Sequence, residues 1–359
     1  MIRFGFLIYF THIAILHKST ILSFKSISMK NILFPLFCLS TLLFSCKKDK
    51  KKEETKTYCV GYALKETTPG YVRAMYWENG KQSQLSEENS VANYITINDK
   101  DIYITGEDKG QAVYWKNGMK NILPNDGPGS AGKMTFHNGN QYIIGTNYLK
   151  QVVWKNGAIF KSLPRASATD SILYYGMIMH QDDLYYTRVE TKGSSVTSTY
   201  FKNETSFSIS NADNNYVSSI AVINSDIYLA GSNKDNTEIY FWKNNVKSVI
   251  AKTSSSGSKL LLTGIQTEGN DIYVFFFEQN TTTNTVTQKY WKNGSEYIVP
   301  VIKDFYPYVI KPIGGKICQG GWFNSSGVYG AAYFVDNEKM ELNKEKSILV
   351  SDLIIVNSK

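Results

Sequence analysis

The chain has 359 residues, 14% of them aromatic, with 26 glycines and 25 tyrosines, and this composition indicates a large all-β protein with a substantial core. Its formal charge of +8 arises at one end, because residues 1–56 hold ten of the 39 basic side chains and three of the 31 acidic ones, leaving 29 and 28 for the rest. The rest is nearly neutral, so the composition gives no support to nucleic-acid binding, which needs a concentrated basic surface.

Two apolar segments come first in the chain. The earlier one, residues 4–16, is shorter than the roughly 20 apolar residues that a transmembrane helix needs. We interpret residues 1–28 as an upstream extension and Met29 as the true start of translation; an unusually long signal with two apolar segments is the alternative. Residues 29–45 have the charged start, apolar middle and small-residue end of a secretory signal peptide.

The end of this signal resembles the lipobox of bacterial lipoproteins. Leu43 and Ser45 match its apolar and small positions, and Cys46 matches the residue that is lipidated and becomes the new N-terminus. An ordinary cleaved signal followed by a chance cysteine is the alternative. Residues 47–56 contain no apolar side chain, so residues 46–56 are predicted to be a lipidated cysteine and a solvated tether. This lysine-rich and acidic stretch resembles the surface-export signal of Bacteroidota lipoproteins, which implies an outer-membrane lipoprotein on the cell surface or the periplasmic side.

From residue 57 onward one motif recurs seven times, most completely as Tyr114, Trp115, Lys116, Asn117 and Gly118. Successive aromatic anchors of the motif lie 38 to 49 residues apart. The anchors are Trp77, Trp115, Trp154, Phe201, Trp242, Trp291 and Phe334. A near-regular period of about 40 to 50 residues with strand-like units is typical of propeller blades, so seven copies predict seven blades. We expect the anchors to pack between adjacent sheets.

Each repeat predicts four short antiparallel strands, which we call A to D in chain order. In residues 91–123, four β-rich runs are separated by turn residues. The third run ends at Asn117 and Gly118, the pair that a two-residue type I′ turn prefers, and this predicts a hairpin between strands C and D.

The two ends of the propeller complete one another. Residues 57–86 begin with a strand B, whereas residues 347–359 have the character of a strand A with no strand B after it. We therefore predict an all-β, seven-bladed propeller over residues 57–359, with four-stranded antiparallel blades. The C-terminal strand should pair with the N-terminal blade, which removes the exposed edges of an open sheet.

The connections differ between the two faces of this propeller. The A–B and C–D turns are short and alike, whereas the B–C and D–A connections vary, with long examples at residues 190–198 and 279–287. Function is commonly carried on variable loops of this kind. In the seventh blade we expect Trp322 and Phe323 on such a loop, near Tyr306, as an aromatic platform for a sugar or a partner chain. Packing of these rings under residues 305–308 is the alternative.

Residues suited to catalysis are few. His137 and His180 each end a strand A, where we expect solvated or hydrogen-bonded side chains. The aspartates that recur at the A–B turns are predicted to be structural, with side chains that accept hydrogen bonds from turn amides. They are Asp101, Asp183, Asp226 and Asp271. Residues 127–132 fit Gly-x-Gly-x-x-Gly, and Lys133 nearly extends them to a P-loop, but this stretch links two strands instead of opening a helix.

No catalytic residue, metal ligand or cofactor is predicted. Cys59 and Cys318 occupy the same place in two strands B. We expect buried free thiols, with a disulfide across the closure as the alternative.

The signal, the tether and the recurring motif together resemble repeat-containing lipoproteins of the Bacteroidota. The resemblance implies a fold and a location but no activity. We predict a lipid-anchored envelope propeller that acts as a non-enzymatic binding or interaction module for a protein or a glycan. The alternative is a propeller hydrolase or lyase that acts on polysaccharide, with carboxylates or histidines meeting at the mouth of the channel.

Overall fold

The computed structural model describes residues 55–64, 71–87, 89–148, 150–164, 171–283, 285–325, 328–336, 338–343 and 348–357. The expected extension, signal peptide and lipidated Cys46, with all but the last residues of the tether, lie outside this part of the chain. In the described part, no helix has the length and apolarity needed to cross a membrane.

The described residues form 28 strands in seven four-stranded antiparallel sheets. Blade 1 contains β28 (Ile348–Asn357), β1 (Thr55–Leu64), β2 (Val72–Glu78) and β3 (Lys81–Gln84). Blade 2 contains β4 (Ser90–Asn98), β5 (Asp101–Asp108), β6 (Gln111–Lys116) and β7 (Met119–Ile122). Blade 3 contains β8 (Gly129–His137), β9 (Asn140–Asn147), β10 (Lys150–Lys155) and β11 (Ala158–Pro164). Blade 4 contains β12 (Ser171–His180), β13 (Asp183–Lys192), β14 (Ser195–Lys202) and β15 (Thr205–Ser208).

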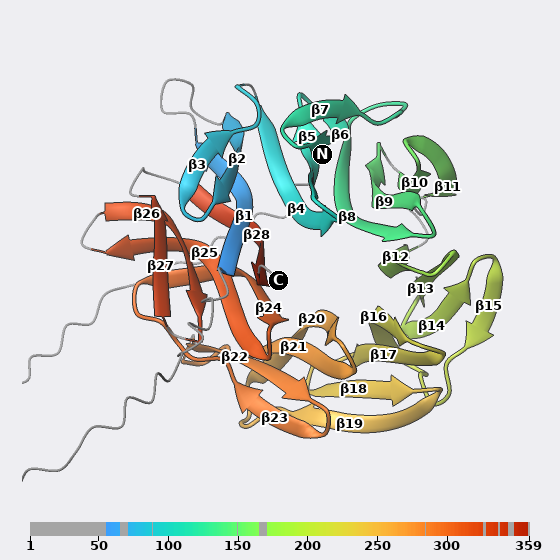
Figure 1. Cartoon of the computed structure of the whole chain (residues 1–359). Coiled ribbons are helices and arrows are strands. Elements are labelled where there is room, and N and C mark those ends of the chain that lie inside the picture. Colours follow the sequence, from blue (N-terminus) through green and yellow to red (C-terminus); the bar gives the residue numbers. More distant parts are fainter. Residues whose placement is uncertain are drawn as a thin grey trace, which may run out of the picture. The chain divides into compact units, whose positions relative to one another are not determined.

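The other three blades follow the same plan. Blade 5 contains β16 (Asn215–Ile223), β17 (Asp226–Asn233), β18 (Glu238–Lys243) and β19 (Val246–Lys252). Blade 6 contains β20 (Ser258–Glu268), β21 (Asp271–Asn280), β22 (Thr285–Lys292) and β23 (Ser295–Ile298). Blade 7 contains β24 (Phe305–Ile313), β25 (Lys316–Ser325), β26 (Val328–Val335) and β27 (Glu338–Asn343). The seven sheets form a ring with strands A innermost and strands D outermost (Figure 1), and this confirms the predicted seven-bladed propeller.

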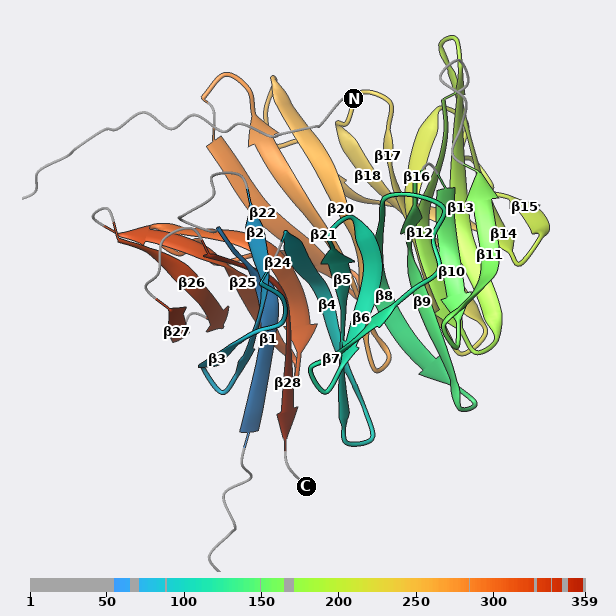
Figure 2. The ribbon, with the colours of Figure 1, turned by 90° about the horizontal axis from the view of Figure 1, so that it is seen from above.

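The ring closes through the C-terminal strand. Strand β28 pairs antiparallel with β1, with Tyr58 opposite Ile354 and Cys59 opposite Leu353. Both strands lie together when the ring is seen from the side (Figure 2). The prediction that the two ends share blade 1 is confirmed, and β28 is the innermost strand of that blade.

Six of the seven aromatic anchors pack between blades, as predicted. Trp77, Trp115, Trp154 and Trp242 are fully buried. Trp115, for example, packs with Val60 and Ala74 of blade 1. The indole N–H groups of Trp154 and Trp242 donate to carbonyl oxygens of the preceding connections at 2.9 and 2.8 Å. These six anchors therefore fix one sheet against the sheet before it, mainly through buried apolar area. Phe334 is the exception, because it packs with Phe305, Phe323 and Ala332 of its own blade.

The Lys-Asn-Gly part of the motif ties the C–D turn to the A–B turn. Asn117 and Gly118 have φ angles of +50° and +83°, which fits the expected primed turn. Asn117 accepts the backbone N–H of Ile102 at 2.9 Å and donates to Asp101 at 2.7 Å, while Lys116 pairs with Asp101 at 2.7 Å. The same arrangement joins Lys202, Asn203 and Asp183; Lys243, Asn244 and Asp226; and Lys292, Asn293 and Asp271.

The recurring aspartates are thus structural, as predicted, but their partners differ from the prediction. They accept hydrogen bonds from lysine and asparagine side chains instead of from turn amides. Hydrogen bonds from Lys116 and then Asn117 hold the pKa of Asp101 below its usual value. The motif that recurs most regularly in the sequence is therefore engaged in holding together the A–B and C–D turns.

Every inner strand contains a β-bulge near its middle, where its pairing with strand B shifts. In blade 2 the bulged residue is Asn93, and a Cβ on the facing Gly106 would collide with the carbonyl oxygen of Val91. The recurring glycine of strand B makes room for the bulge. A bulge redirects a side chain, and Ser351, Asn93 and Lys133, all in bulges, line a cavity at the centre of the ring.

Candidate functional site

The two long B–C connections are mostly strand, which corrects the expected loops. Strand β13 extends to Lys192 and β14 starts at Ser195, so residues 190–198 form a hairpin with a two-residue turn. Strands β21 and β22 likewise extend to Asn280 and from Thr285. The threonines and valines of these segments continue the antiparallel ladder, because β-branched side chains favour strands. The B–C side of the ring therefore carries projecting hairpins.

A groove lies between blades 4 and 5 on this side. It has a volume of about 580 Å³. Three connections form its walls: the β13–β14 turn with Ser194, the D–A connection with Asn211 and Asp213, and the β17–β18 turn with Lys234 and Asp235. Tyr240 of β18 and Lys247 of β19 also line it. The groove thus lies among the connections that vary between blades, as the predicted binding face requires.

The groove combines one aromatic ring with many hydrogen-bonding groups. The ammonium of Lys247 lies 3.6 Å from the centre of the Tyr240 ring and donates to the carbonyl oxygen of Asn211 at 2.9 Å. Burial lowers the pKa of Lys247, while the charges of Glu238 and Asp213 oppose this effect. Such a cation–π contact contributes roughly 0.5–1 kcal/mol at an exposed site. The wall chemistry suits a polar ligand that offers several hydroxyl or amide groups.

The predicted aromatic platform lies in strands, not on a loop. Trp322 and Phe323 belong to β25, and Tyr306 belongs to β24. Trp322 and Tyr306 face each other across the ladder with ring centres 4.2 Å apart and an interplanar angle of 13°. Phe323 is buried and packs with Phe305 and Phe334. Adjacent residues of a strand point to opposite faces, so one surface does not present both Trp322 and Phe323. The role of the Tyr306–Trp322 pair in binding stays a prediction.

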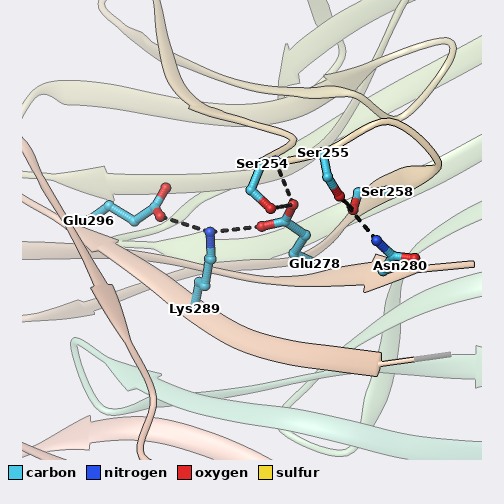
Figure 3. A network of polar contacts seen from close by, with 7 residues as sticks. All are labelled: Ser254, Ser255, Ser258, Glu278, Asn280, Lys289 and Glu296. Carbon is cyan, nitrogen blue, oxygen red and sulfur yellow. Dashed lines mark hydrogen bonds and ion pairs between the residues drawn. The ribbon is translucent and has the colours of Figure 1, made fainter. Parts of the chain in front are cut away.

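A buried carboxylate, Glu278, lies near the end of strand B in blade 6. Its Oε1 accepts the backbone N–H and the hydroxyl of Ser254, and its Oε2 pairs with Lys289 at 2.8 Å (Figure 3). Lys289 also pairs with Glu296 at 3.0 Å. Burial alone would raise the pKa of Glu278, but the hydrogen bonds from Lys289 and Ser254 outweigh it and lower the pKa to about 2. A general acid needs the opposite shift.

Asp108 in blade 2 repeats this design. It is buried, accepts the hydroxyl of Ser86 at 2.7 Å and pairs with Lys120. Ser86 and Ser254 both belong to D–A connections, because one follows β3 and the other follows β19. Both acids therefore fasten a D–A connection to the end of strand B, and we assign them a structural role.

The centre of the ring holds the second large cavity, of about 690 Å³, lined by the inner strands. His180 lies at its edge, with Nε2 3.0 Å from the carbonyl oxygen of Asn224. The Nε2 atom of His137 lies 3.9 Å from Oδ2 of Asp182. Both histidines have the hydrogen-bonded or solvated settings that their positions predicted. Among the residues that the structure describes, no group of three His, Cys, Asp or Glu side chains could hold a metal ion.

The two cysteines of the closure are buried free thiols, as expected. Cys59 and Cys318 belong to one apolar cluster with Trp77, Val350 and Leu353. Burial raises the pKa of both thiols, that of Cys318 to about 12.

The variable connections expected to bind include Ser194 and Ser195 of the groove, in residues 190–198. Sequence reasoning missed Lys234, Asp235, Tyr240 and Lys247 of the groove and the charged lining of the central cavity, because nothing in their residue types separates them from other turn and strand residues. Lys133 was singled out, but only as part of a rejected phosphate motif. A usable signal would have been the charge of Lys133 at a bulge position where four other blades carry a small polar residue. These residues are Asn93, Ser218, Thr263 and Ser351.

The sequence matches no protein-family model and no curated protein. Among solved structures, the β-propeller domain of the Trilobed protease from Pyrococcus furiosus matches with a TM-score of 0.52 and 10% identity, over 82% of this chain and 93% of that one. A puromycin-hydrolyzing peptidase of Mycobacterium tuberculosis matches with a TM-score of 0.50 and 8% identity, over 77% of this chain and 50% of that one. Acylaminoacyl peptidase of Pyrococcus horikoshii matches with a TM-score of 0.50 and 10% identity, over 82% of this chain and 51% of that one.

This chain thus spans about half the length of the two peptidases. At such low identities the likeness shows the fold alone, and in fold the chain is similar to the propeller domain of the Trilobed protease.

Proposed function

We propose that this protein is a lipid-anchored envelope propeller that binds a glycan through the groove between blades 4 and 5. One observation carries the proposal. The groove lies among the variable connections, has a volume of about 580 Å³, and is lined by amides, hydroxyls, carboxylates and the ring of Tyr240. Sugars offer many hydroxyl groups and apolar ring faces, and such walls complement both. The recurring motif, in contrast, is engaged on the opposite face, where its lysine and asparagine bind the aspartate of the A–B turn.

A binding screen tests this proposal. The chain from residue 47 onward should bind at least one polysaccharide in a glycan array. The double variant Lys234→Ala/Asp235→Ala should weaken that binding about tenfold, because it removes polar partners without changing net charge. The matched control, Lys81→Ala/Glu87→Ala, changes an exposed pair in another part of the ring and should leave the affinity unchanged.

Four outcomes would count against glycan binding at the groove. Equal loss in both double variants would show that binding is not specific to this surface. Loss only in Trp322→Ala would move the site to the Tyr306–Trp322 pair. Binding to an envelope protein instead of a glycan would keep the binding role and change the ligand, and release of shortened sugar products would favour the polysaccharide-acting enzyme.

Anchoring is tested separately. The resemblance of residues 43–46 to a lipobox supports a mature chain that begins at lipidated Cys46 in the outer membrane. Mass spectrometry of the mature protein should find an acylated Cys46, and Cys46→Ala should give an unacylated, mis-sorted product. A mature N-terminus elsewhere with no acyl mass would contradict the proposal. Protease shaving of intact cells then separates the cell surface from the periplasmic side.

A further inference from the structure

The wall of the central cavity differs from one side to the other. Its charged side chains come from blades 3, 7 and 1, as Lys133, Lys311 and Asp352. Blades 4 to 6 contribute mostly apolar side chains. These are Ile178, Met179, Ile220, Ala221, Val222 and Ile265. Blades 7 and 1 add the apolar residues Val309, Pro312, Ile313 and Ile354. A molecule in this cavity would therefore meet apolar residues on both sides and charge only on the side of blades 3, 7 and 1.

Asp352 and its partner are satisfied within the protein. One carboxylate oxygen of Asp352 accepts the backbone N–H of Ile95 at 3.1 Å, and the other accepts from the ammonium of Lys311. Both side chains of this pair are largely buried. An ion pair that is enclosed and hydrogen-bonded in this way is costly to break. The Asp352–Lys311 pair is therefore part of the wall.

The amides of the cavity wall are also engaged. Asn93 donates to Ser130 and Ala131 across the blade junction at 2.8 and 2.9 Å. Gln266 donates to the carbonyl oxygen of Ile310 at 2.8 Å. These bonds join the inner strands of neighbouring blades, so they hold the lining in place.

Lys133 differs from these groups. Its side chain is exposed, but the exposed surface faces a cavity that the protein surrounds. Within the described residues its ammonium makes no hydrogen bond and no ion pair. Burial lowers the pKa of Lys133, and the charge of Lys311 lowers it further, while Asp352 acts in the opposite direction. By contrast, the lysines of the recurring motif, such as Lys116 and Lys292, are paired.

The charges of the lining determine the sign of a ligand. Two lysines and one aspartate line the cavity, which leaves one positive charge when His180 is neutral. An ammonium has three hydrogen-bond donors, and within the described residues those of Lys133 have no protein partner, so all three can serve an anionic ligand. The volume of about 690 Å³ lies within the range of small-molecule sites, roughly 300–1,000 Å³.

We propose that the central cavity binds a small organic carboxylate, with Lys133 as the anchor for its carboxylate and the apolar wall of blades 4 to 6 as the seat for its body. This site is separate from the groove, since the two share no lining residue. Lys133 contacts the ligand directly, while the Asp352–Lys311 pair fixes the wall beside it.

Three carboxylates and their neutral counterparts test the proposal: hexanoate against hexanamide, benzoate against benzamide, and galacturonate against galactose. Calorimetric titration of the purified full-length chain should show binding of at least one carboxylate, with its neutral counterpart at least about tenfold weaker. Lys133→Met keeps the length of the side chain and removes its charge, and it should weaken carboxylate binding by about tenfold or more. Its thermal unfolding should stay unchanged, because no hydrogen bond is lost.

The matched control is Lys100→Met, at an exposed lysine in the turn between β4 and β5. It should bind like the parent protein, and so should the groove variant Lys234→Ala/Asp235→Ala. Lys133→Arg should retain part of the affinity, since it restores a positive charge. Failure of all three carboxylates to bind, equal affinity for acids and neutral counterparts, or equal affinity in Lys133→Met would each overturn the proposal. The groove could still bind a glycan in any of these cases.

Discussion

Deletion of residues 348–359 is expected to abolish cooperative folding of the whole ring. The deletion removes the innermost strand of blade 1 and leaves the edge of β1 unpaired. It also removes Val350 and Leu353, both fully buried beside Cys318 of blade 7 and Trp77 of blade 1. Thermal unfolding followed by circular dichroism should show no sharp transition for the deleted protein.

A point variant gives the same test in a chain that still folds. Leu353→Ala should lower the free energy of unfolding by about 2–5 kcal/mol, since it opens a cavity in a core shared by two blades. Val356→Ala is the matched control in the same strand, because Val356 is 38% exposed, and it should cost less than about 1 kcal/mol. If the deletion melts like the full chain, or the two variants are equally stable, β28 does not hold the ring closed.

Acid should lower the free energy of unfolding through protonation of Glu278 more than through protonation of the exposed aspartates of the A–B turns, such as Asp101. The pKa of Glu278 is lowered in the folded state from 4.5 to about 2. Because the folded pKa is depressed, the stabilisation is fully present above pH 4.5 and is lost as the pH falls from there towards 2. A shift of this size corresponds to a contribution on the order of 3 kcal/mol.

The variant Glu278→Gln isolates this contribution. At pH 7 its free energy of unfolding, from urea titration, should lie about 3 kcal/mol below that of the parent, and the difference should shrink towards pH 2. The control is Glu296→Gln, which removes the more exposed partner of Lys289 and should cost about 1 kcal/mol or less. A constant difference between Glu278→Gln and the parent at all pH values would contradict the assignment.

The repeat allowed the fold to be predicted because most blades pack with the same residue types at the same positions. The anchor position of Trp115 and the turn pair of Asn117 and Gly118 recur at a fixed place in each unit, so one readable copy identifies the others. Closure followed from counting strands at the two ends. These features depend on local patterns, which a sequence displays directly.

The sites were harder to predict because they depend on relations between blades. The alternation of a strand predicts which side chains share a face, but a bulge interrupts it in every inner strand, and Lys133 lies in one of these bulges. The same alternation, had it been applied to Trp322 and Phe323, would have placed them on opposite faces. The groove brings together residues from two blades and three turns, and no spacing within one repeat indicates that meeting.

The pairing of β28 with β1 also constrains the order in which the molecule forms. Tyr58 of β1 can pair only after Ile354 of β28 has been synthesised, and Ile354 lies almost at the other end of the chain. Contacts of such long sequence separation are slow to form. Synthesis from the N-terminus makes six complete sheets before the strand that completes blade 1 exists. Until then β1 presents an unpaired edge, so a chaperone that recognises extended segments would find its binding site at the earliest-made strand and lose it when the last one arrives.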